Sequence, residues 1–195
     1  MDKKYGFTGE TLTMADGTVL HQIYALRSFG DIEAGRVGGY VASEKNLSHH
    51  YSCWVHEGAI AYGNAKVAGN AQVSGGARVY GNAHVFGNTR INGNALVCGN
   101  AVVCGASRIT GNAIVTGNAK IYEYAYIGDN AVIDGHANVY DYARVYGHAK
   151  VSGSASVCDY AQIGDSATVL DNAKICGYAH LSGDIKVSDY ETVCA

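Results

Sequence analysis

The sequence predicts an all-β protein: a single-stranded parallel β-helix, shaped as a triangular prism, with 18 residues per coil and about eight coils. One six-residue phrase, Gly-Asn-Ala-x-Val-x, repeats 22 times from Gly63 to Cys194 without insertion or deletion. Its fifth position is always Val, Ile or Leu, and its third is Ala in all but four copies. These apolar positions alternate with variable ones, as in a strand. Strands so short bury their apolar side only by stacking coil upon coil.

Two columns of residues indicate that one coil contains three phrases. Tyrosine recurs at the second position of every third phrase, which predicts a ladder of rings along one corner of the prism, made of Tyr124, Tyr142, Tyr160 and Tyr178. A second column lies at the sixth position of every third phrase and contains aromatic and cysteine residues: Phe86, Cys104, Tyr122, Tyr140, Cys158, Cys176 and Cys194. Gly-Asn, or Asp-Asn and Asp-Tyr, supplies the turn between strands, because Gly and Asn tolerate a positive φ and Asp bonds to nearby backbone.

The segment before the repeat predicts a cap. Lys4 to Met14 and Thr18 to Phe29 have the pattern of two strands around the turn Ala15-Asp16-Gly17. The hexad phase can be traced back to residues 51–56, which places Cys53 and Val55 inside the prism. We therefore expect a β-hairpin cap and a leading segment over residues 1–50, and the β-helix over residues 51–195. A cap is needed because an uncovered coil end is an open sheet edge.

The phrase resembles the hexapeptide-repeat family of left-handed parallel β-helices, most closely at Tyr126-Ile127-Gly128-Asp129-Asn130-Ala131-Val132-Ile133. This resemblance, and nothing in the spacing, implies left-handed coils. The segment before the repeat is similar to a group of bacterial and phage proteins, the YdcK-like proteins, at Phe29, Asp31, Ala34-Gly35, Gly38-Gly39-Tyr40-Val41, Asn46-Leu47-Ser48 and Cys53-Trp54-Val55. Members of that group are often labelled transferases on fold alone, which is analogy and not mechanism.

Composition narrows the class of function. The first residues lack an apolar core and no apolar run reaches membrane length, so we expect a cytoplasmic protein with no membrane contact. The six cysteines show no paired framework, and free thiols are expected. A net charge of -3 gives no electrostatic case for nucleic acid.

If the chain is an enzyme, its resemblance to the hexapeptide-repeat family implies a trimer with a histidine base and an acyl-CoA or acyl carrier donor bound between subunits. Their catalytic loops interrupt the repeat, and here the only room for such a loop lies before residue 63. The repeat holds His84, His136, His148 and His180, each of which could be a base. A polar surface role explains them better, so no catalytic residue is assigned.

Metal binding is not expected either, and no cofactor is assigned. His136 and His148 occupy different corners of one coil, separated by a side of roughly 15–20 Å. That distance is far too long for shared ligands at about 2.1 Å. Cys158, Cys176 and Cys194 face outward on consecutive coils, where neighbours could bridge or share a soft metal.

Two outward surfaces are candidates for binding. Arg90, Arg108 and Arg144 lie in one column with a tyrosine between them and could hold phosphates or carboxylates. An apolar interface is predicted on a second side and around its corner, formed by Phe86, Leu96, Cys98, Val102, Cys104, Ile114 and Val132. A contiguous apolar patch indicates self-association, as a dimer or trimer, or a protein partner.

These observations favour a non-catalytic scaffold or protein-binding solenoid. The resemblance to the YdcK-like proteins implies a phage or prophage accessory protein that acts on a host or defence protein. The alternative is a trimeric hexapeptide acyltransferase with an acyl-CoA donor. A third interpretation is a small-ligand binder that uses the arginine column.

Overall fold

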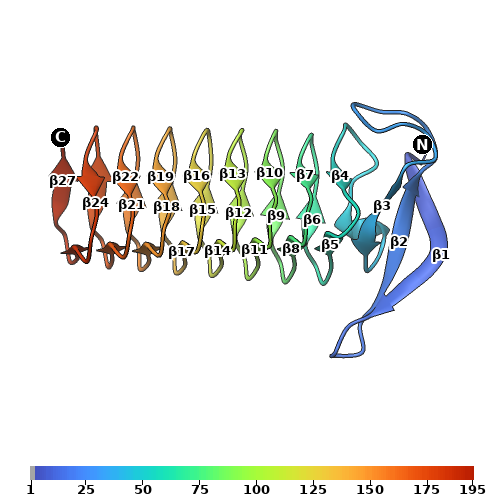
Figure 1. Cartoon of the computed structure of the whole chain (residues 1–195), viewed down its shortest axis with the longest axis horizontal. Coiled ribbons are helices and arrows are strands. Elements are labelled where there is room, and N and C mark those ends of the chain that lie inside the picture. Colours follow the sequence, from blue (N-terminus) through green and yellow to red (C-terminus); the bar gives the residue numbers. More distant parts are fainter. Residues whose placement is uncertain (1–2) are drawn as a thin grey trace.

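The repeat folds into a left-handed parallel β-helix of about nine turns, as the computed structural model of residues 3–195 shows (Figure 1). Three parallel sheets run along the prism, and strands one coil apart pair in register, for example Ile114 with Val132. The 18-residue coil and the all-β class are therefore confirmed. None of the helical segments in residues 3–195 has the length and apolarity needed to cross a bilayer.

The first sheet, here the cap sheet, contains the hairpin and one side of the prism. Its order is β1 (Tyr5–Thr13), β2 (Val19–Ala25), β3 (Val37–Val41), β5 (Ile60–Ala61), β8 (Arg78–Val79), β11 (Leu96–Val97), β14 (Ile114–Val115), β17 (Val132–Ile133), β20 (Lys150–Val151), β23 (Thr168–Val169) and β26 (Lys186–Val187).

The second sheet, here the arginine sheet, forms another side. It runs through β4 (Trp54–Val55), β7 (Gln72–Val73), β10 (Arg90–Ile91), β13 (Arg108–Ile109), β16 (Tyr126–Ile127), β19 (Arg144–Val145), β22 (Gln162–Ile163) and β25 (His180–Leu181).

The third side is the cysteine sheet. It runs through β6 (Lys66–Val67), β9 (His84–Val85), β12 (Val102–Val103), β15 (Lys120–Ile121), β18 (Asn138–Val139), β21 (Ser156–Val157), β24 (Lys174–Cys176) and β27 (Thr192–Cys194). A single-turn helix, η1 (Glu44–Asn46), precedes the first coil.

The interior is a narrow column of small and branched side chains. Ala113, Val115 and Ile127 are fully buried, and so are their counterparts along most of the prism. Cys53 and Val55 are also fully buried, which confirms that the hexad phase begins at residue 51. Two of the positions that lack the usual Ala hold buried hydroxyls, and each donates to a carbonyl three residues earlier: Thr89 to Phe86 O at 2.8 Å and Ser107 to Cys104 O at 2.9 Å.

The turns depend on a positive φ at the first position of each phrase. Gly105 has a φ of 72°, and a Cβ there would lie 2.5 Å from the backbone nitrogen of Glu123 on the next coil. At five of the six positions where Asp replaces Gly, the carboxylate offsets the strain by accepting a backbone N–H one coil later, as Asp129 does from Gly147 at 3.0 Å. The Gly and Asp punctuation predicted from sequence is confirmed.

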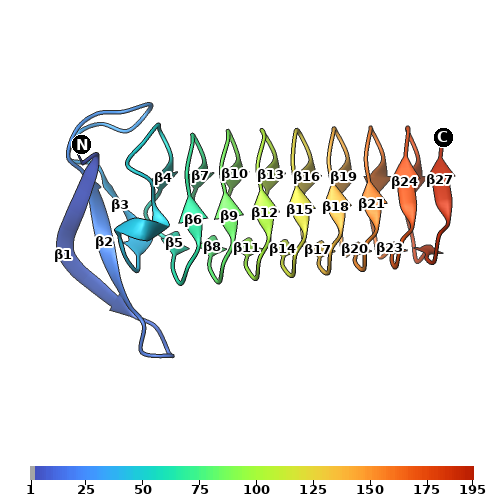
Figure 2. The same ribbon diagram turned by 180° about the vertical axis from the view of Figure 1, so that it is seen from behind.

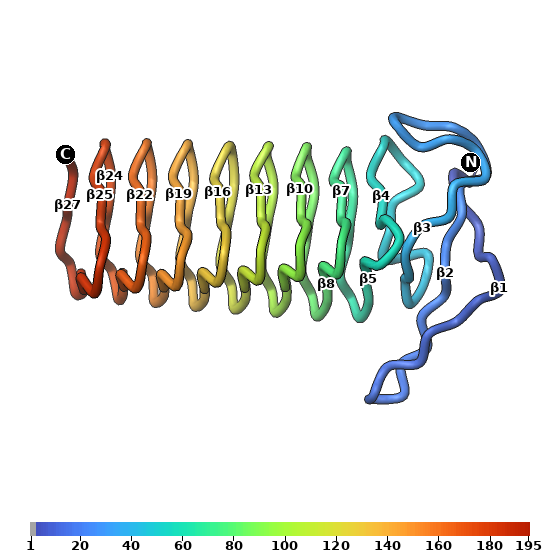
Figure 3. Tube along the Cα trace, viewed as in Figure 1, coloured from blue at the N-terminus to red at the C-terminus, as the bar shows by residue number. Residues whose placement is uncertain are grey.

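The hairpin continues the cap sheet across the N-terminal end of the prism, where Tyr5 and Ile23 join the buried core, and its tip projects beyond the coils (Figures 1 and 2). β2 pairs antiparallel with β3, and β3 pairs parallel with β5 (Figures 1 and 2). Because β3 adds a strand before the repeat, there are about nine turns and not the expected eight. The chain between β2 and β3 leaves the sheet as a long loop that lies beside β4 (Figure 3).

Candidate functional site

The three predicted arginines lie on consecutive or nearly consecutive strands of the arginine sheet. Arg90 pairs with Arg108, and Arg144 follows after Tyr126, whose ring lies 5.2 Å from the Arg144 Cζ. All three arginine side chains are exposed. Within residues 3–195 none of them forms a salt bridge, so this face carries a row of uncompensated guanidinium groups. Such a row attracts phosphate or carboxylate groups.

The loop between β2 and β3 covers the N-terminal end of this face. Trp54 occupies an outward position of the first coil, yet its side chain is fully buried. Phe29 lies against it, edge to face, with ring centroids 5.5 Å apart. Phe29 and Ile32 exchange two backbone hydrogen bonds of 2.9 Å, which close the loop into a tight turn over the sheet. The prism therefore has its protruding loop here, before the uninterrupted repeat.

The loop and the arginine column enclose two adjoining hollows. The first has a volume of about 580 Å³ and lies among Asp31, Glu33, Arg36, His56 and Arg90. The second has about 710 Å³ and continues along the sheet past Arg90 and Arg108 to Tyr124. Asp31, Gln72 and Arg90 line both, so we treat the pair as one feature, the loop groove. Both volumes lie in the range of small-molecule sites.

His56 has a defined tautomer in the loop groove. Gln72 donates from Nε2 to the Ser52 carbonyl at 2.7 Å, which directs its Oε1 at His56 Nε2, also at 2.7 Å. An amide oxygen only accepts, so His56 donates from Nε2 and its Nδ1 is the unprotonated nitrogen. Nδ1 can therefore accept a proton from a bound molecule.

The four repeat histidines do not enter this groove. His84, His136, His148 and His180 are exposed, and none of them is among the residues lining either hollow. His180 Nε2 lies 3.4 Å from the Tyr146 hydroxyl. His136 and His148 occupy turns of different corners, as expected from their spacing.

The tyrosine ladder forms along one edge of the arginine sheet. The rings of Tyr124, Tyr142, Tyr160 and Tyr178 stack at 4.9, 5.1 and 5.0 Å, with planes within 5° of parallel. A third hollow, of about 460 Å³, lies between this ladder and the outward side chains of Arg144 and Gln162.

The predicted apolar interface divides between two sides. Leu96, Ile114 and Val132 pair along the cap sheet and are half-buried, while Cys98 beside them is buried. Val102 lies on the cysteine sheet between His84 and Lys120, so polar side chains interrupt the apolar surface there. Phe86 is 42% exposed and Cys104 half-buried on that same sheet.

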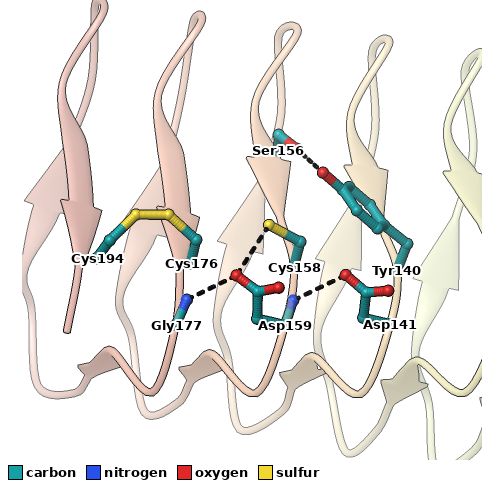
Figure 4. Close-up of a disulfide and its surroundings, with 8 residues drawn as sticks. All are labelled: Tyr140, Asp141, Ser156, Cys158, Asp159, Cys176, Gly177 and Cys194. Carbon is teal, nitrogen blue, oxygen red and sulfur yellow. Dashed lines mark hydrogen bonds between the residues drawn. A yellow bond between two sulfur atoms is a disulfide. The ribbon is translucent and has the colours of Figure 1, made fainter.

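The cysteines depart from the expectation of free thiols. Cys176 and Cys194, one coil apart, form a disulfide between β24 and β27, with Cα atoms 4.5 Å apart (Figure 4). In-register parallel strands bring equivalent residues within bridging distance. The bridge considered for neighbours in the column of Cys158, Cys176 and Cys194 therefore forms at the last pair. Cys53, Cys98, Cys104 and Cys158 are free thiols.

Next to the disulfide, Cys158 lies in a small cluster with Asp141 and Asp159, whose potential ligand atoms are within 4.8 Å of one another (Figure 4). Both carboxylates already accept backbone N–H groups, Asp141 from Asp159 at 3.1 Å and Asp159 from Gly177 at 2.9 Å. The cluster is therefore explained by turn geometry.

His56 and the loop are the features that sequence reasoning missed. His56 is the sixth residue of the earliest phrase, 51–56, so its outward position was accessible from the repeat phase. The position of the loop could not be found from the repeat, because the loop has no period and its docking depends on Trp54.

Comparison with known proteins gives one informative match. The "Uncharacterized acetyltransferase YdcK" of Escherichia coli (strain K12) is 38% identical to the chain over 63 residues. The match covers 30% of this chain and 19% of that protein, so it spans about a fifth of the relative's length. No protein-family model matches the chain. The chain is thus a β-solenoid with a distant acetyltransferase-named homologue, which favours the acyltransferase alternative over the phage scaffold.

Proposed function

We propose that the chain is an acyltransferase that binds a phosphorylated thioester donor, such as an acyl-CoA, in the loop groove. The observation that carries the proposal is the convergence of His56, the protruding loop and two arginines of the column, Arg90 and Arg108, in one groove. The acetyltransferase name of the distant relative supports the same reaction class.

The donor's phosphates fit the arginine column. Arg90 and Arg108 are neighbours on β10 and β13, so two guanidinium groups one coil apart face the same ligand. Guanidinium groups bind phosphate through paired, charge-assisted hydrogen bonds. The acyl group then lies toward the loop end of the groove, where His56 is.

The acceptor fits the loop end. Asp31 and Glu33 contribute carboxylates to the hollow that His56 lines, which suits an acceptor with an amine or hydroxyl group. His56 Nδ1 takes the proton of that group as its nitrogen or oxygen attacks the thioester carbonyl. The new C–N or C–O bond forms, the C–S bond breaks, and the thiolate leaves and is protonated as His56 returns to neutral.

The test separates binding from chemistry. Calorimetry should show that the full chain binds CoA, and Arg108→Ala should weaken binding about tenfold through loss of a charge-assisted bond. Arg78→Ala, on an exposed arginine of β8 in the cap sheet, is the matched control and should change nothing. His56→Gln should keep CoA affinity but lower thiol release from acetyl-CoA, measured with a panel of amines and amino sugars, by about 10²-fold or more.

Two results would overturn the proposal. One is an absence of CoA binding at millimolar concentration. The other is thiol release that His56→Gln leaves at the wild-type rate.

A second candidate function is a non-catalytic binding solenoid. The half-buried column of Leu96, Ile114 and Val132 on the cap sheet supports contact with another chain. A solenoid of this kind would bind its partner through the cap sheet and would respond neither to CoA nor to substitution of His56.

A further inference from the structure

The tyrosine ladder ends inside the loop groove, at a coil whose second-position residue has no ring. We call the vacant ring position on that coil the open level. Second-position side chains along this corner are Ser52, Asn70, Asn88, Ala106, Tyr124, Tyr142, Tyr160 and Tyr178. Ala106 ends at Cβ, so the space that a tyrosine ring occupies on each of the next four coils is open at its level. Ala106 and Tyr124 both line the second hollow of the groove.

The ring of Tyr124 has one free face. Tyr142 stacks on its other side at 4.9 Å, and in residues 3–195 no aromatic ring stacks on the side toward Ala106. Exposure agrees: Tyr124 is 58% exposed, while Tyr142 and Tyr160, each between two rings, are 49% and 47% exposed. An open ring face in a hollow is a stacking platform for another planar ring.

The opposite side of the open level carries an amide. In this corner Asn70 Nδ2 donates to Asn88 Oδ1 at 3.0 Å. The next acceptor in that series would lie at position 106, where Ala106 offers none. Within residues 3–195 the Asn88 amide nitrogen therefore has no side-chain acceptor. Asn88 and Tyr124 are two coils apart, about 9.6 Å at the spacing of strands, which leaves room for one flat ring between them.

The arginines flank the same level. Arg90 and Arg108 are each two residues after the second position of their coil, and both line this hollow. A planar ring at the open level therefore has two guanidinium groups beside it. The hollow of about 710 Å³ is large enough for a nucleotide.

We propose that this level is a base-binding subsite: the purine ring of a nucleotide stacks on Tyr124 above Ala106, and its phosphates bind Arg90 and Arg108. The inference rests on the proposed function in that the nucleotide is the adenosine diphosphate part of the CoA donor. It also stands as a nucleotide site without acyl transfer.

The experiment tests the subsite by placing a tyrosine ring in the open level. Calorimetric titration of the full chain with ADP and with inorganic pyrophosphate should give about tenfold tighter binding of ADP, since stacking contributes that much. Ala106→Tyr, which continues the ladder by one ring, should lower ADP affinity to that of pyrophosphate and leave pyrophosphate binding unchanged. Ser154→Tyr, an exposed small residue at the same phrase position of another corner, is the matched control and should bind both ligands as wild type does.

A second variant tests the subsite in case Ala106→Tyr disturbs the fold. Tyr124→Leu removes the platform without adding volume and should also abolish the preference for ADP. The subsite is wrong if ADP binds no tighter than pyrophosphate, or if Ala106→Tyr binds ADP as well as wild type does. CoA binding and thiol release that survive Ala106→Tyr unchanged would reject the subsite and keep the acyltransferase. ADP binding as described, without any thiol release, would keep the subsite and reject the acyltransferase.

Discussion

Lys4 is a charged residue that the cap buries completely, and it ties the hairpin to the first coil. Its ammonium group donates to the Cys53 carbonyl at 2.8 Å and to the Tyr51 carbonyl at 3.3 Å, and it lies 4.9 Å from the centre of the Phe29 ring. Burial lowers the pKa of Lys4 and raises the pKa of the Cys53 thiol beside it. The carbonyls and the ring replace the water that a buried ammonium loses.

His49 makes the cap sensitive to pH. Its ring stacks on Tyr5 at 4.3 Å, and its Nδ1 accepts the Lys4 backbone N–H at 3.3 Å. Burial lowers the pKa of His49 below 6.5, so the unfolded chain binds a proton more readily than the folded chain. The free energy of unfolding therefore falls as pH drops from 7 through 6.5 toward the folded pKa.

We expect His49→Gln to flatten this loss between pH 7 and pH 5, as measured by urea unfolding. The Lys3 ammonium lowers the pKa of Glu44, and that carboxylate loses its contribution only below pH 4.5, outside the window. His50→Gln, at the exposed neighbour, is the control and should keep the wild-type slope. An unchanged slope in His49→Gln would contradict the assignment.

At the scale of elements, the prism repeats each contact one coil later, so columns of side chains act as units. The tyrosine ladder shows this most clearly, because rings one strand apart must stack when the strands are in register. The same register places Cys176 beside Cys194 and Arg90 beside Arg108. A column therefore has inner members with two neighbours and end members with one.

This difference predicts that replacing an inner tyrosine of the ladder lowers the free energy of unfolding more than replacing an end one. Tyr142→Ala removes two stacked pairs and should lower the free energy of unfolding by roughly 1–3 kcal/mol. Tyr124→Ala, one coil away with a single stacked neighbour, should cost about half as much. Urea unfolding of both variants measures the ratio, and equal costs would show that stacking does not stabilise this corner.

Reduction of the Cys176–Cys194 disulfide should loosen the last coil. The bond closes a loop of 18 residues, and such a cross-link is worth about 3 kcal/mol. With reductant, hydrogen exchange over residues 177–195 should accelerate while exchange in the central coils stays unchanged. Cys194→Ser should reproduce the effect without reductant, and Cys158→Ser is the control. Equal exchange in both redox states would mean that the bridge adds no stability.

On the scale of the whole molecule, the sides of the prism differ in the partners they suit. The arginine sheet carries charge and the loop groove, and the cap sheet carries the apolar column of Leu96, Ile114 and Val132. A small ligand and a second chain would therefore occupy different sides. Acyltransferase chemistry and self-association are compatible in this arrangement.

We expect light scattering to give a native mass that is a multiple of the 20.4 kDa chain mass. Ile114→Asp places a charge in the apolar column and should return the protein to the mass of one chain. Thr168→Asp, at an outward position of the same sheet beyond the apolar column, should keep the oligomer. A wild-type monomer, or an oligomer that Ile114→Asp leaves intact, would refute the interface.

Sequence alone determined the features that repeat: the 18-residue coil, the inward Ala and Val, the stacked tyrosines and the arginine column. Each follows from a local period, because in-register backbone pairing carries every position to its equivalent one coil later. The open level at Ala106 is also visible in the column once the period is known. The disulfide follows from the same pairing, and the expectation of free thiols was wrong because it relied on cysteine spacing along the chain.

Only the tertiary structure decided where the segment without a period lies. The loop between β2 and β3 docks on Trp54, and this docking creates the groove around His56 and buries an outward tryptophan. The burial of Lys4 against Cys53 depends likewise on residues 49 positions apart. Such contacts come from packing between segments distant in the chain, and no local pattern records which surface a loop will cover.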